Sequence, residues 1–391
     1  MKLFDRTKLN TLSLSQRTSK SAIERIAWHP SMAPPPVSQH YRELIERIAV
    51  QMLDARQQQA SVILVFGAHL IKNGLGPLVK HMLEQGYVSH VSTNGAGSIH
   101  DWEFAFHGYS EEDVRANVHI GQFGIWEETG KYINLAVLLG AARGLGYGEA
   151  IGEMIHQECL MIPSCDALER QVLHFVENHQ FGHPKLAAMI DLLRTMQSQK
   201  LSVPTGRLPL AHPFKQYSFQ AAAFGAKVPV TIHPGFGYDI IYTSRYNCGA
   251  AFGRASEVDW LRFAHSVSQL EGGVYLSIGS AIMSPMIFEK ALSMARNVAR
   301  QSAQSISDFL IVVNDIQPTG EWSWGTGQEP PKDSPAYFLR FCKTFDRMGA
   351  REMHYLCLDN RAFLMNLYHC LRQKSEPAPE NTGVTVPRSS L

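Results

Sequence analysis

The chain has 391 residues, 45% of them hydrophobic and 18% charged, so it can bury a substantial core and is not disordered as a whole. Its 36 Lys and Arg residues nearly balance 35 Asp and Glu residues, and the resulting net charge of +1 argues against a nucleic-acid partner. The longest apolar run, residues 135–142, is far shorter than the roughly 20 residues that span a bilayer, which argues against a membrane protein.

Residues 1–38 show no sustained periodicity and end in a proline-rich stretch that cannot be helical, so we expect an extended N-terminal arm. Its first 26 residues lack the apolar core of a secretory signal, and the six cysteines form no Cys-x-x-Cys pair. Both features favour a cytoplasmic protein with free thiols. Residues 374–391 are rich in Pro, Ser, Thr and Glu and are predicted to be a disordered tail.

Residues 39–373 are predicted to form a single α/β domain that begins with a helix over residues 40–58. Short aliphatic runs then recur, most of them followed by a small-residue or polar loop and a helical pattern. Continuous apolar runs are typical of parallel strands covered by helices on both faces. Strands are predicted at residues 61–66, 88–92, 228–232, 274–278, 309–313 and 353–358.

Residues 128–199 interrupt this alternation. Four consecutive helical patterns occupy residues 129–143, 149–158, 166–177 and 185–196. We therefore expect an inserted helical layer within the α/β frame. The glycines of residues 144–148 superficially resemble a dinucleotide fingerprint, but no strand precedes them, and a helix junction is the better interpretation.

The loops that follow the strands contain the candidate functional residues. Residues 67–74 follow the first strand and residues 93–101 follow the second, so both loops are expected at the carboxyl edge of one sheet. Gly95 and Gly97 would let the backbone approach a ligand, and a helix starting near Asp101 would offer free N–H groups to an anion. Residues 279–281 again clear space beside a strand.

Polar residues near these loops leave several interpretations open. Asp239 could accept a hydrogen bond from a ribose hydroxyl or a substrate amine, or simply cap the next turn. Glu127 and Glu128 begin a helix, where the macrodipole favours carboxylates, and need no catalytic role. Of the 17 histidines, His100 is the one that we would test first, because it lies in a glycine-rich loop at the expected ligand edge.

The two glycine-containing loops resemble the core of the deoxyhypusine synthase family. Members of that family carry a Thr-Ser-Asn-Leu-x-Ser-Ser-Gly loop after one strand and Thr-Thr-Ala-Gly-Gly after the next. The corresponding segments here are residues 67–74 and 93–101, and the similarity continues in order through residues 218–239 and 274–297 to residue 315. The resemblance implies a Rossmann-like parallel sheet flanked by helices, NAD as cofactor, and a homo-oligomer, either dimer or tetramer, with active sites completed across an interface.

The sequence departs from that family at the position of its chemistry. The family's active-site lysine, which forms an imine with the transferred aminobutyl group, is replaced by Met283, and a thioether cannot form an imine. An acidic pair expected after the glycine loop is Ile99-His100 here, which removes negative charge suited to a polyamine. Authentic deoxyhypusine synthesis is therefore not expected. Lys72 could supply an amine in principle, but a surface or phosphate contact is favoured.

We therefore predict an NAD-dependent transferase or oxidoreductase that acts on a small amine or alcohol substrate and holds no metal. His100 is the predicted general base, oriented by Asp101 or Glu103. The residues expected to bind the dinucleotide are Asn73, Thr93, Asn94, Gly95, Ala96, Gly97, Asp239, Gly279 and Ser280. The alternatives are a non-catalytic NAD-binding or nucleotide-binding scaffold, and a metal-assisted hydrolase built from His69, His100, Asp101 and Glu103.

Overall fold

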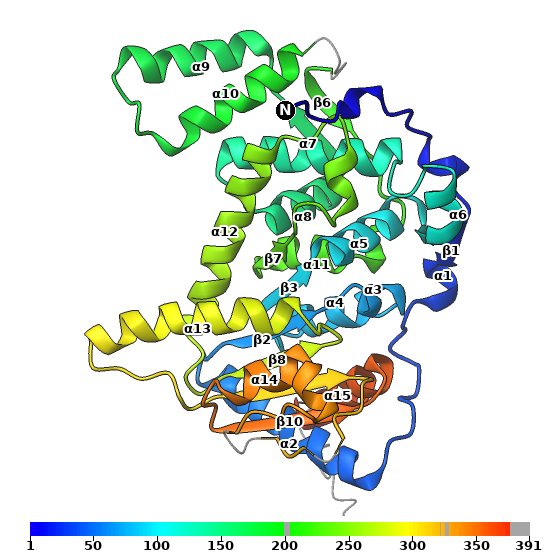
Figure 1. The fold of residues 1–391 in the computed structure, drawn as a ribbon, viewed down its shortest axis with the longest axis vertical. Coiled ribbons are helices and arrows are strands. Elements are labelled where there is room, and N and C mark those ends of the chain that lie inside the picture. Colours follow the sequence, from blue (N-terminus) through cyan, green and yellow to red (C-terminus); the bar gives the residue numbers. More distant parts are fainter. Residues whose placement is uncertain (199–203, 321, 325–327, 376–391) are drawn as a thin grey trace, which may run out of the picture.

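The structure is a computed structural model and describes residues 1–198, 204–320, 322–324 and 328–375. Its centre is a six-stranded parallel sheet in the order β10-β9-β8-β2-β3-β7 (Figure 1). The strands are β2 (Val62–Phe66), β3 (His90–Asn94), β7 (Val230–His233), β8 (Val274–Ile278), β9 (Leu310–Asp315) and β10 (Glu352–Cys357). All six predicted strands are present, and the predicted parallel α/β fold is confirmed.

The strand order shows how the chain winds. From β2 the sheet grows through β3 to β7, and the chain then returns to the other side of β2 and adds β8, β9 and β10. Counted along the chain, this is the order 3-2-1-4-5-6 of a doubly wound Rossmann fold. In such sheets the direction of winding reverses between the first and fourth strands, which here are β2 and β8, and ligands bind outside the carboxyl ends of the strands at that point.

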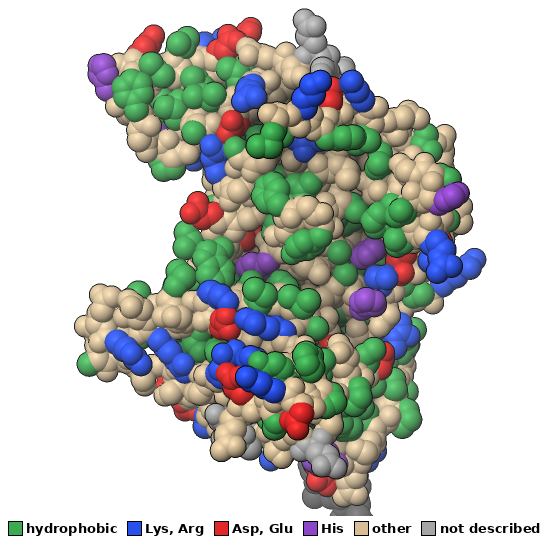
Figure 2. Space-filling view, viewed as in Figure 1, with side chains coloured by type: hydrophobic (Ala, Val, Ile, Leu, Met, Phe, Trp, Pro, Cys, Tyr) green, Lys and Arg blue, Asp and Glu red, His purple; other side chains and the backbone are tan. Residues whose placement is uncertain are grey.

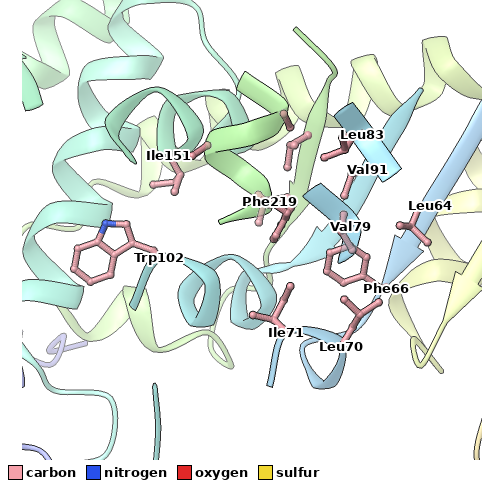
Figure 3. Close-up of a cluster of buried hydrophobic side chains, with 14 of the residues drawn as sticks. Leu64, Phe66, Leu70, Ile71, Val79, Leu83, Val91, Trp102, Ile151 and Phe219 are labelled. Atoms are coloured by element: carbon pink, nitrogen blue, oxygen red, sulfur yellow. The ribbon is translucent and has the colours of Figure 1, made fainter. Parts of the chain in front are cut away.

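Two helical layers cover the sheet, and side chains of β2 alternate between them. Val62, Leu64 and Phe66 belong to one buried cluster, whereas Ile63 and Val65 belong to the other. Figure 3 shows the first cluster, in which Phe66 lies against Phe219 with ring centroids 5.3 Å apart. Because both faces are buried, the strand reads as a continuous apolar run.

Each covering helix contributes side chains to one or both of the two clusters. The first cluster includes side chains of α2 (Gln39–Gln57), α3 (His69–Lys72), α4 (Gly76–Glu84), α5 (Gly95–His107), α11 (Phe219–Ala226) and α15 (Asn360–Ser375). The second includes side chains of α12 (Gly249–Ser268), α13 (Met283–Gln301) and α14 (Arg340–Asp346). The predicted tail is helical at its first two positions, which belong to α15, and residues 376–391 lie outside the described part of the chain.

The inserted helical layer is present. It consists of α7 (Glu127–Arg143), α8 (Tyr147–Gln157), α9 (Cys165–Glu177) and α10 (Pro184–Gln197), and in Figure 1 α9 and α10 project from the body at the upper left. A two-stranded antiparallel ribbon of β5 (Cys159–Ile162) and β6 (Gly206–Pro209) was not predicted. Each of its strands has only four residues, too few to show a clear alternation.

The N-terminal arm is more structured than predicted. It contains β1 (Ser19–Ala22) and α1 (Ile23–Ile26), and β1 pairs antiparallel with β4 (Tyr109–Glu112), which precedes α6 (Val114–His119). The carboxylates that begin α7 hold the arm: Thr11 Oγ1 donates to Glu127 at 2.6 Å and Ser13 Oγ donates to Glu128 at 2.7 Å. The arm therefore packs on the domain through pairings that no local pattern shows.

Charge is unevenly distributed over the surface. Figure 2 shows Lys and Arg side chains gathered over α13 and α14 on the face in view. Lys343 and Arg347 both pair with Glu329, at 3.6 and 3.3 Å, so acidic residues neutralise part of this surface. Across the described residues, no helix has the length and apolar character needed to cross a membrane.

Candidate functional site

The loops after β2, β3 and β8 lie side by side because β3 and β8 both pair with β2 in parallel. The contact between two of the loops is close: a Cβ atom on Gly67 would lie 2.3 Å from the carbonyl oxygen of Gly279. Gly279 itself has a φ of +53°, and a Cβ atom there would meet no other atom within 4 Å. Glycine at this position thus leaves open space at the boundary between β2 and β8.

A cavity of about 350 Å³ opens at this boundary, and we call it the switch-point cavity. Its lining includes His69, Asn73, Gly279, Ala281, Asn314, Asp315, Gln317, Asp359 and Asn360. The Asn314 amide nitrogen donates to the carbonyl oxygens of Leu356 and Leu358, at 3.0 and 2.8 Å. Its Oδ1 atom is buried and has no hydrogen-bond partner among the described residues. An orphaned acceptor of this kind is costly unless a ligand or water supplies a donor.

A second cavity, of about 310 Å³, also borders α3, through Lys72, and we call it the His100 cavity. Helix α5, β4, the N-terminal arm and the loop after β7 form its walls. Its lining includes Arg17, Lys72, Ala96, His100, Glu103, Glu111, Tyr238 and Asp239. Both cavities contain predicted cofactor residues: Asn73 and Gly279 line the switch-point cavity, and Ala96 and Asp239 line the His100 cavity.

His100 is connected to Glu103 through a serine that the sequence did not indicate. Nδ1 of His100 lies 2.7 Å from Oγ of Ser110, and that hydroxyl donates to Oε2 of Glu103 at 2.6 Å. Burial lowers the pKa of His100, although the nearby Glu103 carboxylate acts in the opposite direction. His100 is therefore held as a neutral imidazole near physiological pH, the form that accepts a proton.

Glu103 itself is a buried anion with four donors. Arg17 binds both carboxylate oxygens, at 2.7 and 2.8 Å, and Thr129 Oγ1 and Ser110 Oγ complete the set. Burial raises the pKa of Glu103, but the charge and hydrogen bonds of Arg17 outweigh that effect and leave the pKa lowered. Glu103 thus remains ionised, and it reaches His100 only through Ser110.

The structure places Asp101 away from His100. Its oxygens accept hydrogen bonds at the start of α11, from the Ser218 hydroxyl at 2.6 Å and from the Phe219 backbone at 3.1 Å. Burial raises the pKa of Asp101 to about 6. Helix α5 also begins at Gly95 and not near Asp101 as predicted, because the Asn94 side chain accepts from the Gly97 N–H and caps the helix there.

Several residues that were predicted to bind the cofactor make contacts within the protein. Thr93 is fully buried, and its hydroxyl donates to the Phe66 carbonyl at 2.9 Å. A Cβ atom on Gly97 would lie 2.2 Å from that hydroxyl, so Gly97 lets α5 pack against β3. Ser280 Oγ accepts from the Ser284 N–H at 3.2 Å, at the start of α13. Five of the predicted cofactor residues line neither cavity: Thr93, Asn94, Gly95, Gly97 and Ser280.

Asp239, in the loop after β7, lies against the first residue of α5. A Cβ atom on Gly95 would be 2.7 Å from its carboxylate, and Oδ2 accepts from the Gly235 N–H at 2.7 Å. Burial raises the pKa of Asp239 to about 6. Lys72, in the same cavity, is 3.1 Å from Glu111, whose φ of +68° is unusual for a residue other than glycine. The cavity therefore offers a carboxylate, an ammonium group and an imidazole to a small polar ligand.

The residues of the metal hypothesis do not converge. His69 lines the switch-point cavity, His100 lines the other cavity, Asp101 caps α11, and Glu103 binds Arg17. Within residues 1–198, 204–320, 322–324 and 328–375, no three His, Cys, Asp or Glu side chains are grouped so that they could hold a metal ion.

The sequence did not indicate Ser110 or Arg17. Arg17 is 86 residues from its partner Glu103, and only the packing of the arm brings the two together. The pair Asn314-Asp315, directly after an apolar strand, did place polar residues at the expected ligand edge, but the sequence did not show that the Asn314 oxygen has no partner among the described residues.

Comparison with known proteins gives distant structural similarity only. No protein-family model matches the sequence, and no curated protein matches it. The chain is similar to a conserved putative LOR/SDH protein from Methanococcus maripaludis S2, with 15% identity, 88% of this chain and 74% of that chain covered, and a TM-score of 0.43. It is also similar to AgrE in a ternary complex with ornithine and NAD⁺, with 14% identity, 87% and 34% coverage, and a TM-score of 0.42.

A third similar structure is a putative deoxyhypusine synthase from Entamoeba histolytica, with 9% identity, 85% and 89% coverage, and a TM-score of 0.35. The family that the sequence resembles is thus present among the structural neighbours, at a distance. The chain spans about a third of the length of the AgrE chain. Because all three TM-scores are below 0.5, function has to be argued from the residues of this chain.

Proposed function

We propose that this protein is an NAD-dependent enzyme that oxidises a small amine or alcohol, as a divergent relative of the deoxyhypusine synthases. The observation on which this rests most is the switch-point cavity, where a Rossmann strand order, an open glycine and an orphaned buried acceptor coincide. The open glycine follows β8 and the orphaned acceptor lies on β9, so a ligand bound between these strands would account for both.

The lining of the switch-point cavity fits the adenosine half of the dinucleotide. Asp315 and Asp359 can accept hydrogen bonds from ribose hydroxyls, since each binds a backbone N–H through one oxygen only, at 3.1 and 2.8 Å. Oδ1 of Asn314 can accept from an exocyclic amino group. No Lys or Arg is among the described residues that line this cavity, so the phosphates would lie outside it.

Neither cavity alone is large enough for a whole dinucleotide, since pockets for such ligands reach about 1,000 Å³. The two cavities, of about 350 and 310 Å³, both border the short helix α3, the first through His69 and the second through Lys72. In our proposal the dinucleotide crosses this helix, Lys72 contacts a phosphate, and the reacting end and the substrate share the His100 cavity.

His100 would then supply the base. Bound NAD would serve as the hydride acceptor. Oxidation of a carbon that bears an amine or hydroxyl group also releases a proton, and His100, which lines the cavity, would take it. The apolar wall residues Ile99, Phe123 and Ile240 would limit the water that reaches the base.

No imine with the protein is required in this scheme. Met283, at the position of the family's lysine, is the first residue of α13 and supplies no amine. The proposed reaction accordingly ends with a free imine or carbonyl product and not with transfer of a group held on the enzyme.

Two measurements test this proposal. NAD binding is measured by calorimetry for the natural protein and for Ala281→Trp, which fills the switch-point cavity, with Ala303→Trp as a control on the exposed turn after α13. We expect loss of binding only in Ala281→Trp, and natural protein that binds no NAD would refute the proposal. A non-catalytic scaffold would also bind NAD, so this measurement does not separate it from the enzyme.

Turnover distinguishes the enzyme from such a scaffold. NADH formation is followed at neutral pH across a panel of small amines, amino acids and alcohols. His100→Gln should lower turnover about 100-fold or more, as expected for loss of a general base, while the affinity for NAD stays nearly unchanged. Equal turnover in the natural protein and in His100→Gln would remove this residue from the mechanism.

A further inference from the structure

A continuous hydrogen-bonded path connects the N-terminal arm to the proposed base. It runs from the Arg17 guanidinium through the Glu103 carboxylate and the Ser110 hydroxyl to Nδ1 of His100, with heavy-atom distances of 2.7, 2.6 and 2.7 Å. Arg17 and Glu103 side chains are 2% and 1% exposed, so solvent cannot substitute for either partner.

Chemistry fixes the direction of every proton along this path. An ionised carboxylate can only accept, so the single hydroxyl proton of Ser110 points to Glu103. Oγ of Ser110 can then only accept from His100, which places the ring proton on Nδ1. In a neutral imidazole the other nitrogen, Nε2, is consequently the one with the free lone pair.

The arm supplies Arg17, and it also holds the strand that carries Ser110. Strand β1 of the arm pairs with β4, and Ser21 lies directly opposite Ser110 in this ribbon. Ser21 Oγ donates to Glu111 at 2.8 Å, and Lys72 also contacts Glu111, so the same ribbon forms a wall of the His100 cavity. Residues 17 to 22 thus organise the surroundings of a base that lies about 80 residues later, at position 100.

We propose that Ser110 and Arg17 are positioning residues that hold His100 in the Nδ1-protonated tautomer and so keep Nε2 available as the proton acceptor. The tautomer itself follows from the geometry of the cavity wall alone, and only its use in proton transfer rests on the proposed function. Arg17 acts through Glu103, because a carboxyl group without that cation could be protonated and could then donate to Ser110.

Nitrogen NMR of the full-length protein labelled at histidine tests the tautomer without cofactor or substrate. His100 is assigned by comparison with His100→Gln, and the spectrum of the natural protein should show a protonated Nδ1 and an unprotonated Nε2. In Ser110→Ala the hydroxyl that accepts from Nδ1 is absent, and the ring proton of His100 should shift largely to Nε2. Ser110→Thr retains the hydroxyl and should restore the natural spectrum.

Ser21→Ala is the matched control, because it lies opposite Ser110 in the same ribbon but bonds to Glu111 and not to His100. It should leave the tautomer unchanged. Arg17→Lys keeps a positive charge beside Glu103 but cannot bind both oxygens as a fork, so we expect the Nδ1-protonated form to persist in a smaller fraction. A natural protein with the proton on Nε2, or an unchanged tautomer in Ser110→Ala, would overturn the proposal.

Kinetics provide the second readout. Ser110→Ala should lower kcat at least about tenfold, part of the 10²–10⁴-fold typical of a positioned base, with the KM for NAD unchanged. Ser110→Thr should recover most of that loss. If the natural protein forms no NADH at all, the proposed reaction fails while the NMR result still decides the tautomer.

Discussion

The carbonyl oxygen of Gly279 occupies the space beside Gly67 so closely that a Cβ atom on Gly67 would lie 2.3 Å from it. This contact joins the loops after β2 and β8, the two strands between which the winding of the sheet reverses. The switch-point cavity lies at this junction, so its shape depends on the absence of one side chain.

We predict that Gly67→Ala destabilises the protein by about 1–3 kcal/mol, because the new methyl group meets backbone and cannot be relieved by a rotamer change. Urea unfolding measures this change. Gly253→Ala is the control: it lies within α12 and its Cβ would meet nothing within 4 Å, so it should stabilise the protein by about 0.5–1 kcal/mol. Equal effects of the two substitutions would contradict the close contact.

Thr93 provides a test of whether a residue predicted to bind the cofactor is structural. Its hydroxyl donates to the Phe66 carbonyl at 2.9 Å in a fully buried setting. Thr93→Val keeps the shape but leaves that carbonyl without this donor, which should cost about 1–3 kcal/mol in urea unfolding. The affinity for NAD, measured by calorimetry below the unfolding transition, should not change; a clear loss of affinity would return Thr93 to the cofactor site.

The buried ion pair of Arg17 and Glu103 should be sensitive to removal of one partner. Arg17→Met leaves Glu103 buried without its cation and should reduce the free energy of unfolding by about 3–5 kcal/mol. Arg143→Met is the matched control, because Arg143 pairs with Glu153 at 2.7 Å with side chains 50% and 27% exposed, and such pairs contribute at most about 1 kcal/mol. Chemical denaturation of both variants measures the contrast.

Asp259 should make stability depend on pH. Its Oδ2 atom accepts from the Ile232 and Gly148 N–H groups, at 2.8 and 2.9 Å, and Arg262 and Glu149 are the charged groups nearby. Burial raises its pKa to about 7. Between the ordinary pKa of an aspartate, about 4, and this value, the folded state holds a proton that the unfolded state has lost, so this group's contribution to stability falls as pH rises.

Asp259→Asn removes that titration. The free energy of unfolding of the variant, relative to the natural protein, should therefore increase from about pH 4 to about pH 7 and level off above that pH. Asp101 and Asp239 also have raised pKa values, but they titrate in both proteins and cancel in the difference. A difference that does not vary with pH would show that Asp259 is ionised throughout this range in the folded protein.

Local patterns in the sequence determined the elements of the sheet and the insert. The apolar runs of β2, β8 and β9 predicted these strands clearly, because burial on both faces gives a continuous apolar run and not an alternating one. The helical periods of α2 and α7 to α10 were likewise visible, because a helix buries one face through residues spaced three or four apart.

Only the tertiary structure decided which polar groups meet. The strand order placed Asn314 beside Gly279, and the packing of the arm placed Arg17 on Glu103. Asp101 and Thr93, which the sequence predicted to lie in the site, make hydrogen bonds within the core. A hydrogen bond between residues far apart in the chain has no periodicity, because it depends on how separately formed elements pack, and that packing is set by the whole core.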